Sequence, residues 1–336
     1  MKKSFFAAFF FLLMLVSCKQ RSEPINNQVP TRDSANVKNL TQRNVRFIPQ
    51  WMHQAQFAGV YVAQAKGIYQ NYGLNVEILS GGPNLPAADA IRDNKADICS
   101  MFLLSAMREY SKGNRVVNLA QVFQKSSLLL VAKKDKGINT LSDINGKKIA
   151  LWRSDFQEIS LMFIKKNRLN VEIVPIDWSI NLFMQDGVDL MNVMLYNEYN
   201  QLIQSGLNRE ELVVFPMSKN GFDIPEDGLY CTDEYWLENP ALCKDFADAT
   251  MEGWMYAINN QEEAVAIVLD VMRKAHLAAN RPHQEWMLSQ LRESILYHQS
   301  SIGKLRKPDF EMAYNLLIQT NLIETPIDYK TFIGAR

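Results

Sequence analysis

This chain has few cysteines, few histidines and no net charge. Its 336 residues include only four cysteines and four histidines, and 36 basic side chains balance 36 acidic ones. So few cysteines exclude a small fold held together by disulfides. A net charge of zero argues against a general binder of nucleic acid or membrane surfaces, since both rely on excess Lys and Arg. With 47% hydrophobic residues, the chain is expected to bury a large core in about two domains.

Long hydrophobic runs are also missing, apart from one short run near the start. Apolar residues 5–16 follow Lys2 and Lys3, and they are too few for an ordinary membrane span but typical of a secretory signal. The run ends in Leu15-Val16-Ser17-Cys18, which resembles the lipobox of bacterial lipoproteins. That resemblance implies a signal peptide over residues 1–18 and a lipid on Cys18, whereas an N-terminal membrane anchor would need a longer run. The polar composition of residues 19–44 predicts a flexible tether.

The remaining cysteines are Cys99, Cys231 and Cys243, so at most one internal disulfide can form. No CxxC pair occurs, which argues against a zinc ribbon. Cys99 lies where a buried strand is predicted, and we expect it to act as a small hydrophobic residue. Cys231 and Cys243 could pair in an oxidising compartment, although their spacing in the sequence does not give their separation in space.

The common motifs of nucleotide-binding proteins, serine hydrolases and metalloproteases are missing as well. The histidines are far apart in the chain, and we expect them to be surface or helix-packing residues rather than metal ligands. They are His53, His276, His283 and His298. The sequence therefore predicts no catalytic residue, no metal site and no cofactor.

What the chain does contain is an alternation of short apolar runs with helical patterns. Strands are predicted at residues 45–48, 74–79, 98–102, 148–151, 171–175 and 190–195, with helices at 57–71, 87–94, 158–167 and 182–185. Such an alternation predicts an α/β fold with mostly parallel sheets. Longer helical patterns at 241–259, 262–276 and 282–298 are expected to pack back onto the first unit.

A polar connection at Lys133–Gly137 separates two similar α/β units, and a second crossing is expected near residues 215–224. Lobe 1 would comprise residues 45–136 and 225–336, and lobe 2 residues 137–224. Two lobes joined by two connections form a cleft, which is a usual place for a small-ligand site.

Aromatic and polar residues follow several predicted strands, where open α/β sheets place their ligands. They are Trp51, Gly81, Gly82, Phe102, Trp152, Tyr196 and Glu198. The glycines could present bare backbone amides to a polar ligand or form an ordinary turn. The tryptophans could stack on a flat ring or pack in a core. Glu198 could accept hydrogen bonds from an aminopyrimidine edge, or it could be a glutamate favoured at a helix N-terminus.

Longer motifs occur in a recognisable order along the body of the chain. They are Trp51–Gly67, Tyr72–Ile78, Gly81-Gly82-Pro83, Ala96-Asp97-Ile98, Leu141–Lys147 and Val193–Glu198. Together they resemble the ABC-transporter solute-binding proteins for thiamine pyrimidine precursors, of the SsuA/THI5-like family. The resemblance covers about residues 45–257, while the helical tail matches only in character. It implies a type II periplasmic-binding-protein fold, with two α/β lobes, a ligand cleft and a helical C-terminal segment on lobe 1.

The same resemblance implies a function and a set of residues. The protein would be a monomeric, lipid-anchored receptor in the bacterial cell envelope, facing the periplasm or the exterior, with no nucleic-acid partner. It would close around a formylaminopyrimidine or hydroxymethylpyrimidine and present it to an ABC permease. The strand-end residues would line the cleft, and the resemblance adds Gln56, Ser105, Gln124 and Asp155 as further candidates.

Two other interpretations stay open. Fungal thiamine-pyrimidine synthases, to which the chain is also similar, consume an active-site histidine and carry a cysteine cluster. Here Phe57 stands where that histidine would be, His53 is out of register, and the cluster is missing, so we expect a binding protein rather than an enzyme. A receptor for another small ligand, such as a sulfonate, is the second alternative. Glu198 argues against it, because a buried carboxylate repels an anion.

Overall fold

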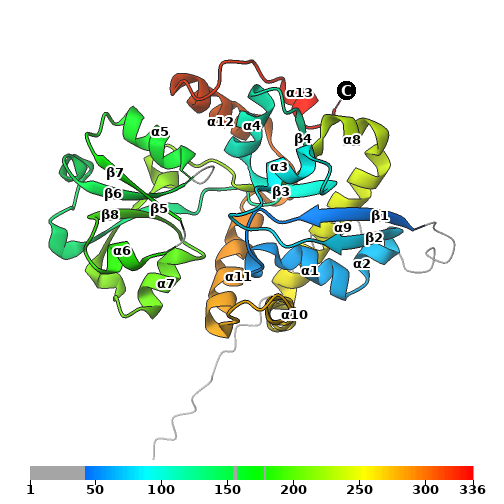
Figure 1. Cartoon of the computed structure of the whole chain (residues 1–336), viewed down its shortest axis with the longest axis horizontal. Helices are drawn as coiled ribbons and strands as arrows, with labels where there is room; N and C mark the ends of the chain where they lie inside the picture. The colour runs from blue at the N-terminus through cyan, green and yellow to red at the C-terminus, as the bar shows by residue number, and fades with distance from the viewer. Residues whose placement is uncertain (1–41, 154–156, 178, 336) are drawn as a thin grey trace, which may run out of the picture.

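The computed structural model describes residues 42–153, 157–177 and 179–335, and they form two lobes with one sheet each (Figure 1). We call the lobe with the first sheet lobe 1. Its strands are β1 (Arg43–Ile48), β2 (Leu74–Ile78), β3 (Ile98–Phe102), β4 (Val116–Gln121) and β10 (Asp227–Thr232), in the spatial order β2-β1-β3-β10-β4. Strand β1 is parallel to β2 and β3, whereas β10 is antiparallel to both of its neighbours.

The sheet of lobe 2 repeats this pattern. Its strands are β5 (Leu128–Lys133), β6 (Lys148–Trp152), β7 (Glu172–Ile176), β8 (Leu190–Met194) and β9 (Leu212–Pro216), in the spatial order β7-β6-β8-β5-β9. Strand β6 is parallel to β7 and β8, and β5 is antiparallel to β8 and β9. In each sheet the fourth strand in spatial order, β10 in lobe 1 and β5 in lobe 2, is antiparallel to both of its neighbours. Each of these strands adjoins a connection between the lobes.

The position of β5 differs from the predicted division at residue 136. This strand, Leu128–Lys133, belongs to the sheet of lobe 2, where it is hydrogen-bonded between β8 and β9. The chain therefore crosses between the lobes before β5, at residues 122–127, and returns between β9 and β10. The polar segment 133–137 is a surface turn containing the 3-10 helix η3 (Lys134–Lys136). An almost wholly apolar strand fits the interior of either sheet, so its composition did not indicate which lobe it joins.

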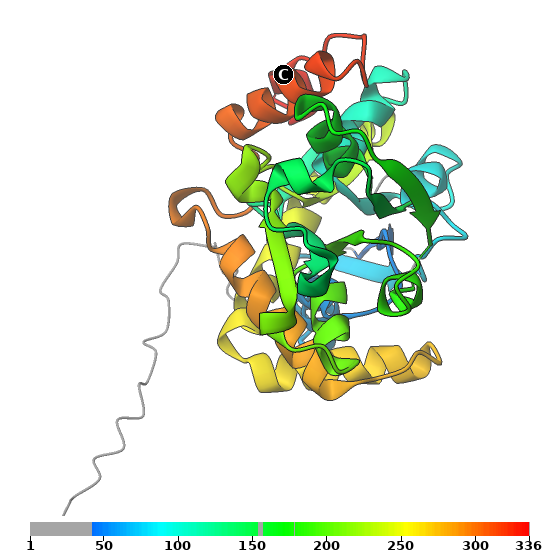
Figure 2. The same cartoon turned by 90° about the vertical axis from the view of Figure 1, so that its left-hand side faces the viewer.

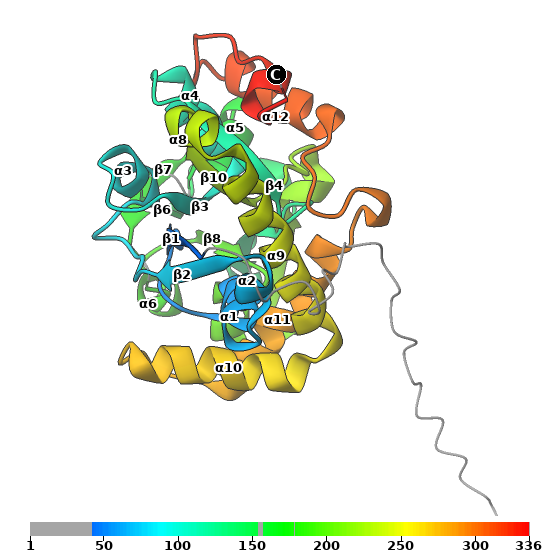
Figure 3. The ribbon, with the colours of Figure 1, turned by 90° about the vertical axis from the view of Figure 1, so that its right-hand side faces the viewer.

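Most helices belong to lobe 1. They are α1 (Ala58–Ala65), α2 (Ile68–Asn71), α3 (Ala87–Arg92), α4 (Leu103–Ser111), α8 (Asp233–Glu238), α9 (Pro240–Asn259), α10 (Gln261–Lys274), α11 (Arg281–Ile295), α12 (Lys307–Gln319) and α13 (Tyr329–Phe332). The predicted helix 57–71 is broken into α1 and α2, because Gly67 between them adopts a left-handed backbone conformation. The predicted C-terminal helices do pack on lobe 1, with α9 and α10 against α1 (Figure 3). The predicted fold class is confirmed.

Lobe 2 is smaller and has three described α-helices. They are α5 (Glu158–Lys166), α6 (Asn181–Met184) and α7 (Glu198–Gln204). Figure 1 shows α5 on one face of the lobe 2 sheet and α6 and α7 on the other, and Figure 2 views this lobe from its outer side. Both faces of the sheet are therefore covered, as its apolar strands require.

The helices α1 and α9 make a very close contact in lobe 1. A Cβ atom added to Gly253 in α9 would lie 2.2 Å from the backbone oxygen of Gly59 in α1, and one added to Gly59 would lie 2.3 Å from the ring of Trp254. Small residues on both helices thus allow their backbones to approach closely enough to bury the large side chain of Trp254, which is 2% exposed.

The cores of the two lobes meet on one side of the molecule. One apolar cluster contains Leu104 and Met107 of α4, which belong to lobe 1, together with Leu130 of β5 and Phe163 of α5, which belong to lobe 2. The lobes therefore pack against each other directly beside their connections. Of the helices in the described parts of the chain, none combines the length and apolar character that a membrane crossing requires.

Candidate functional site

A small cavity lies between the lobes, at the ends of strands from both sheets. Six of the predicted site residues line it: Trp51, Gln56, Phe102, Trp152, Tyr196 and Glu198. Gln54, Met194 and Asn197 complete the lining. Trp51, Gln54, Gln56 and Phe102 belong to lobe 1, and the other five belong to lobe 2. The residues converge because the carboxyl ends of parallel strands meet at one edge of each sheet.

Two tryptophans contact each other across this cavity. Trp51 follows β1 in lobe 1 and Trp152 ends β6 in lobe 2, and their ring centroids are 6.4 Å apart with the ring planes at 87°. The indole nitrogen of Trp152 donates to the backbone oxygen of Asn192 at 2.8 Å, which fixes the ring. The volume open to water-sized molecules is only about 30 Å³. The two lobes therefore leave little open space around the two rings.

Glu198 is buried at the start of α7, with 5% of its surface exposed. One carboxyl oxygen accepts a hydrogen bond from the backbone nitrogen of Met194 at 2.9 Å, and the other accepts one from the side-chain amide of Asn197. Burial raises its pKa to about 7. The residue therefore closes the turn before α7, as expected of a glutamate at a helix N-terminus, while it also lines the cavity. The helix N-terminal interpretation made from the sequence is confirmed, and the ligand-binding interpretation stays a prediction.

A buried amide network holds the lobe 1 side of the cavity. Asp227 of β10 accepts a hydrogen bond from Gln56 at 2.9 Å on one oxygen and from Gln50 at 2.8 Å on the other. The side chain of Gln54 donates to Gln56 at 2.7 Å. Burial raises the pKa of Asp227 to about 7, although the two amide donors oppose this shift. Gln56 is thus oriented by a carboxylate behind it, and sequence patterns did not reveal that partner.

The phenol of Tyr196 lies among three buried carboxyl groups. Burial raises its pKa, and the negative charges of Asp227, Glu226 and Glu198 raise it further. Glu226, next to Asp227, has its own pKa raised to about 8, chiefly by burial. The region between the lobes is therefore acidic, a property that the zero net charge of the whole chain conceals.

His283 joins the lobes at the edge of this region. It lies on α11 of lobe 1, and its ring nitrogens contact the side-chain oxygens of Asn197 and Asn200 in lobe 2, each at 2.9 Å. Burial lowers its pKa. This histidine has the helix-packing role expected from the sequence, but its link through Asn197 to Glu198 had no local sequence signal.

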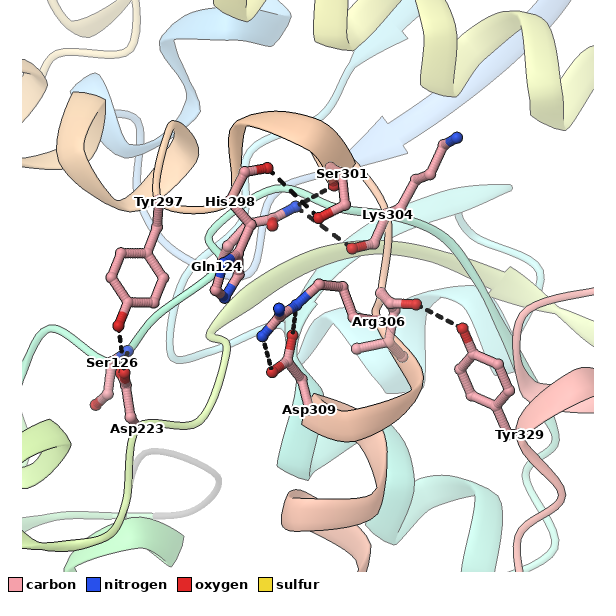
Figure 4. A network of polar contacts seen from close by, with 11 residues as sticks. Gln124, Ser126, Asp223, Tyr297, His298, Ser301, Lys304, Arg306, Asp309 and Tyr329 are labelled. Atoms are coloured by element: carbon pink, nitrogen blue, oxygen red, sulfur yellow. Dashed lines mark hydrogen bonds and ion pairs between the residues drawn. The ribbon is translucent and has the colours of Figure 1, made fainter.

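Gln124, a predicted site residue, lies in the first connection between the lobes and does not line the cavity (Figure 4). Its side-chain amide donates to the backbone oxygen of Ser301 at 2.8 Å. Nearby, Tyr297 donates to Asp223 at 3.2 Å, and Asp223 also accepts from the backbone of Ser126 at 3.0 Å. The C-terminal segment 297–304 is thus fastened to both connections. The position of Gln124 gives it a structural role there.

Gly81 and Gly82 line a separate surface hollow beside Met52 and Ser80. A Cβ atom on Gly81 would lie 1.8 Å from the backbone oxygen of Pro49, so only glycine permits this loop to approach the segment that carries Trp51. The pair therefore positions the Trp51 segment, and the structure does not bring it into the cavity.

The other predicted positions have different outcomes. Ser105 is buried on α4 and does not line the cavity. Asp155 and Cys18 lie outside the described residues. The sulfur atoms of Cys231 and Cys243 are 3.9 Å apart, and both residues are free thiols in the core of lobe 1, as is Cys99. Within the described ranges, no three His, Cys, Asp or Glu residues are arranged to hold a metal ion.

Raising the pH from 5.5 to 8.5 is expected to lower the free energy of unfolding through the buried carboxyls. Their folded-state pKa values are raised to about 7 for Glu198 and Asp227 and about 8 for Glu226, so the folded protein keeps protons that the unfolded chain has released. This contribution is lost progressively as the pH rises from the unfolded toward the folded pKa. Urea denaturation across the range should show a flatter dependence for Glu226→Gln. Equal dependence in both proteins would contradict the raised pKa of Glu226.

Comparison with known proteins agrees with this architecture. A model of the family described as "NMT1/THI5 like" matches residues 54–264. The fold resembles the periplasmic aliphatic sulphonate binding protein SsuA of Escherichia coli, with a TM-score of 0.64 and 15% identity over 88% of this chain and 97% of that one. It also resembles the ligand-binding component of an ABC-type import system from Staphylococcus aureus, with a TM-score of 0.61 and 12% identity over 88% of this chain and 99% of that one.

Three curated relatives also share sequence similarity with this chain. A candidate thiamine biosynthesis protein of Haemophilus influenzae is 25% identical over 53% of this chain, and the match spans 58% of that protein. The riboflavin-binding protein RibY of Chloroflexus aurantiacus is 21% identical over 79% of this chain and 77% of its own length. A 4-amino-5-hydroxymethyl-2-methylpyrimidine phosphate synthase of Schizosaccharomyces pombe is 23% identical over 36% of this chain and 35% of its own length. Because the family model matches more than half of the sequence, this chain belongs to the NMT1/THI5-like family.

Proposed function

We propose that this protein is the ligand-binding component of an ABC importer and that it encloses a thiamine-pyrimidine-type heterocycle between its lobes. One observation carries the proposal: Trp51 and Trp152, from opposite lobes, meet at a cavity that Glu198 also lines. Family membership and the relative from Haemophilus influenzae support a thiamine-related ligand. The ABC-type binding proteins of similar fold support a role in import with a permease as partner.

The lining of the cavity suits a flat ring with polar edges. Trp51 and Trp152 offer aromatic surfaces from both sides, so a ring that replaces their mutual contact gains stacking area in each lobe. Glu198 offers a carboxyl that is half protonated near neutral pH, because its pKa is about 7. In its neutral form it can donate to a ring nitrogen and accept from an exocyclic amine, which matches the edge of an aminopyrimidine.

The location of the protein follows from the same proposal. A binding component of an importer works outside the cytoplasm, and the N-terminal motif supplies a means of attachment at Cys18. A lipid on that thiol would hold the protein at a bacterial membrane. Mass spectrometry of the protein purified from its membrane would detect the lipid.

Riboflavin is a second candidate ligand, and the similarity to RibY over 79% of this chain supports it. Its ring system is also flat and carries polar edges, so Trp51 and Trp152 would stack on it in the same manner. Synthesis of the pyrimidine is less consistent with the cavity. Phe57, where the synthase-like histidine was expected, is buried at 3% exposure in the core of lobe 1, and His53 is hydrogen-bonded to Tyr61 and Ser80.

Calorimetric titration of the purified protein tests the proposal. We expect saturable binding of 4-amino-5-hydroxymethyl-2-methylpyrimidine or its formylamino analogue, and Glu198→Ala should weaken it by about 1 to 3 kcal/mol because the change removes the hydrogen-bonding carboxyl. Glu211→Ala is the control, since Glu211 caps the exposed 3-10 helix Arg209–Glu211 and does not line the cavity. Binding of riboflavin alone would select the second candidate. Binding of an alkanesulfonate alone, or pyrimidine formation from pyridoxal phosphate, would refute the proposal.

A further inference from the structure

A second small cavity adjoins the first between the lobes. Phe102 and Met194 line both cavities, so these two side chains form the partition. Apolar residues supply most of the remaining lining, together with two acidic ones: Leu104, Leu128, Ile159, Pro225, Glu158 and Glu226. The volume open to water-sized molecules is about 20 Å³. Phe102 belongs to lobe 1 and Met194 to lobe 2, so opening of the lobes would separate the two side chains of this partition. The first and second cavities would then join, and the flexible methionine side chain makes this easier.

Glu226 is the unusual residue of this second cavity. It is 2% exposed, and one carboxyl oxygen accepts from the backbone of Ser127 at 2.6 Å and from the hydroxyl of Ser126 at 3.2 Å. The other oxygen, Oε2, has no hydrogen-bond partner among the described residues. Buried polar atoms are nearly always paired, and leaving one unpaired is unfavourable. Near neutral pH the carboxyl carries a proton in the unliganded protein, because its pKa is about 8, and Oε2 is the oxygen left to hold that proton. A bound amine or hydroxyl donor favours the ionised form, in which Oε2 is a free acceptor at the wall of the cavity.

The charges around this cavity determine what kind of group can approach. Glu158 is paired with Arg108 of α4, so its charge is compensated within the protein. The carboxyls of Glu198 and Asp227 are nearby, since both act with Glu226 on the phenol of Tyr196. Glu198 and Asp227 are partly ionised near neutral pH, because their pKa values are about 7, and in the ionised form they repel an anionic group. An amine or a hydroxyl group would instead supply the missing donor.

We propose that Glu226 Oε2 accepts a hydrogen bond from an amino or hydroxyl substituent of the bound heterocycle, and that the cleft thereby selects amine- or hydroxyl-bearing ligands over phosphate- or sulfonate-bearing ones. This inference rests on the proposed function, in which the ring lies between Trp51 and Trp152. The ring then occupies the first cavity, and its substituent passes Met194 into the second.

The test compares pyrimidines that differ only in one substituent. The probes are 4-amino-2-methylpyrimidines with an aminomethyl, a hydroxymethyl or a methyl group at position 5, and the phosphate ester of the hydroxymethyl compound. We expect the wild-type protein to bind the aminomethyl and hydroxymethyl compounds roughly tenfold more tightly than the methyl compound, and the phosphate ester most weakly. In Glu226→Gln the amide can keep the bond from Ser127 through its oxygen, but its NH₂ group replaces the free acceptor. The preference should fall by roughly tenfold, with little change for the methyl compound.

Glu109→Gln is the matched control, because Glu109 is a buried glutamate elsewhere in lobe 1, bonded to Lys112 and Asn114. It should leave the preference unchanged. The readout is a ratio of affinities measured on the folded protein, so partial loss of stability does not alter it. Equal weakening of all compounds by Glu226→Gln, or tightest binding of the phosphate ester, would overturn the inference while leaving the proposed function intact.

If riboflavin binds and the pyrimidines do not, the same comparison is made with riboflavin and lumiflavin, which lacks the hydroxyl-bearing chain. A preference for riboflavin that Glu226→Gln removes would support the inference, and one that it retains would overturn it. Failure of both series to bind would refute the proposed function, and the inference with it, before any variant is considered.

Discussion

Replacement of Gly253 by alanine is expected to lower the free energy of unfolding by about 3 kcal/mol, the upper part of the range for an overpacked core. The new Cβ would lie 2.2 Å from the backbone oxygen of Gly59 and 2.8 Å from the Cβ of Ala63. Neither atom is the end of a flexible side chain, so α1 and α9 would have to move apart. The better helix propensity of alanine offsets only about 1 kcal/mol of this loss.

Urea denaturation followed by circular dichroism measures the change. Lys244→Ala is a control in the same helix, since Lys244 is exposed and its ion pair with Asp248 lies at the surface. It should change the free energy of unfolding by no more than about 0.5 kcal/mol. A Gly253→Ala protein as stable as the wild type would show that the contact between α1 and α9 relaxes easily.

Replacement of Trp152 by alanine is expected to weaken ligand binding roughly 100-fold, on the order of 2 to 3 kcal/mol. This change removes the aromatic surface that lobe 2 contributes to the cavity, and it also removes the ring contact with Trp51 that joins the lobes. Trp152→Phe keeps a ring but loses the hydrogen bond to the backbone oxygen of Asn192, so it should lose about tenfold or less.

Affinity is measured by calorimetry with whichever heterocycle binds the wild-type protein. Trp236→Ala serves as the control, because Trp236 packs against Gly334 near the C-terminus and lies outside the cavity lining. It should bind as the wild type does. If Trp152→Ala and Trp236→Ala lose affinity to the same extent, Trp152 acts through general stability rather than through contact with the ligand.

Local patterns predicted those parts of the site that depend on single strands. The alternation of apolar runs and helical patterns located most strands, and the carboxyl end of each parallel strand is where a ligand-facing residue is expected. Trp51, Phe102, Trp152 and Tyr196 were found in this way, and the structure brings them together at one cavity. Their role in binding stays a prediction.

Features that depend on distant segments could not be predicted in this manner. Gln124 was a candidate only through the family resemblance, and in the structure its side-chain amide is bonded to the backbone of segment 297–304. Asp227 orients Gln56 from 171 positions away in the chain, and the acceptor of Glu226 becomes significant only because the two lobes bury it. Such pairings follow from the packing of whole lobes. The periodicity of apolar residues in a short stretch of sequence does not predict that packing.

The antiparallel strand of each sheet also has a consequence for synthesis. Lobe 2 is built from one continuous stretch, with β5 and β9 at either end of residues 128–216, so its sheet can be completed as soon as that stretch has left the ribosome. The sheet of lobe 1 cannot, because β10 inserts between β3 and β4 and is made more than 100 residues later than either. Until then β3 and β4 each present an unpaired edge of buried, apolar strand. The N-terminal half of this chain should therefore be the part that most needs protection from aggregation before synthesis is complete.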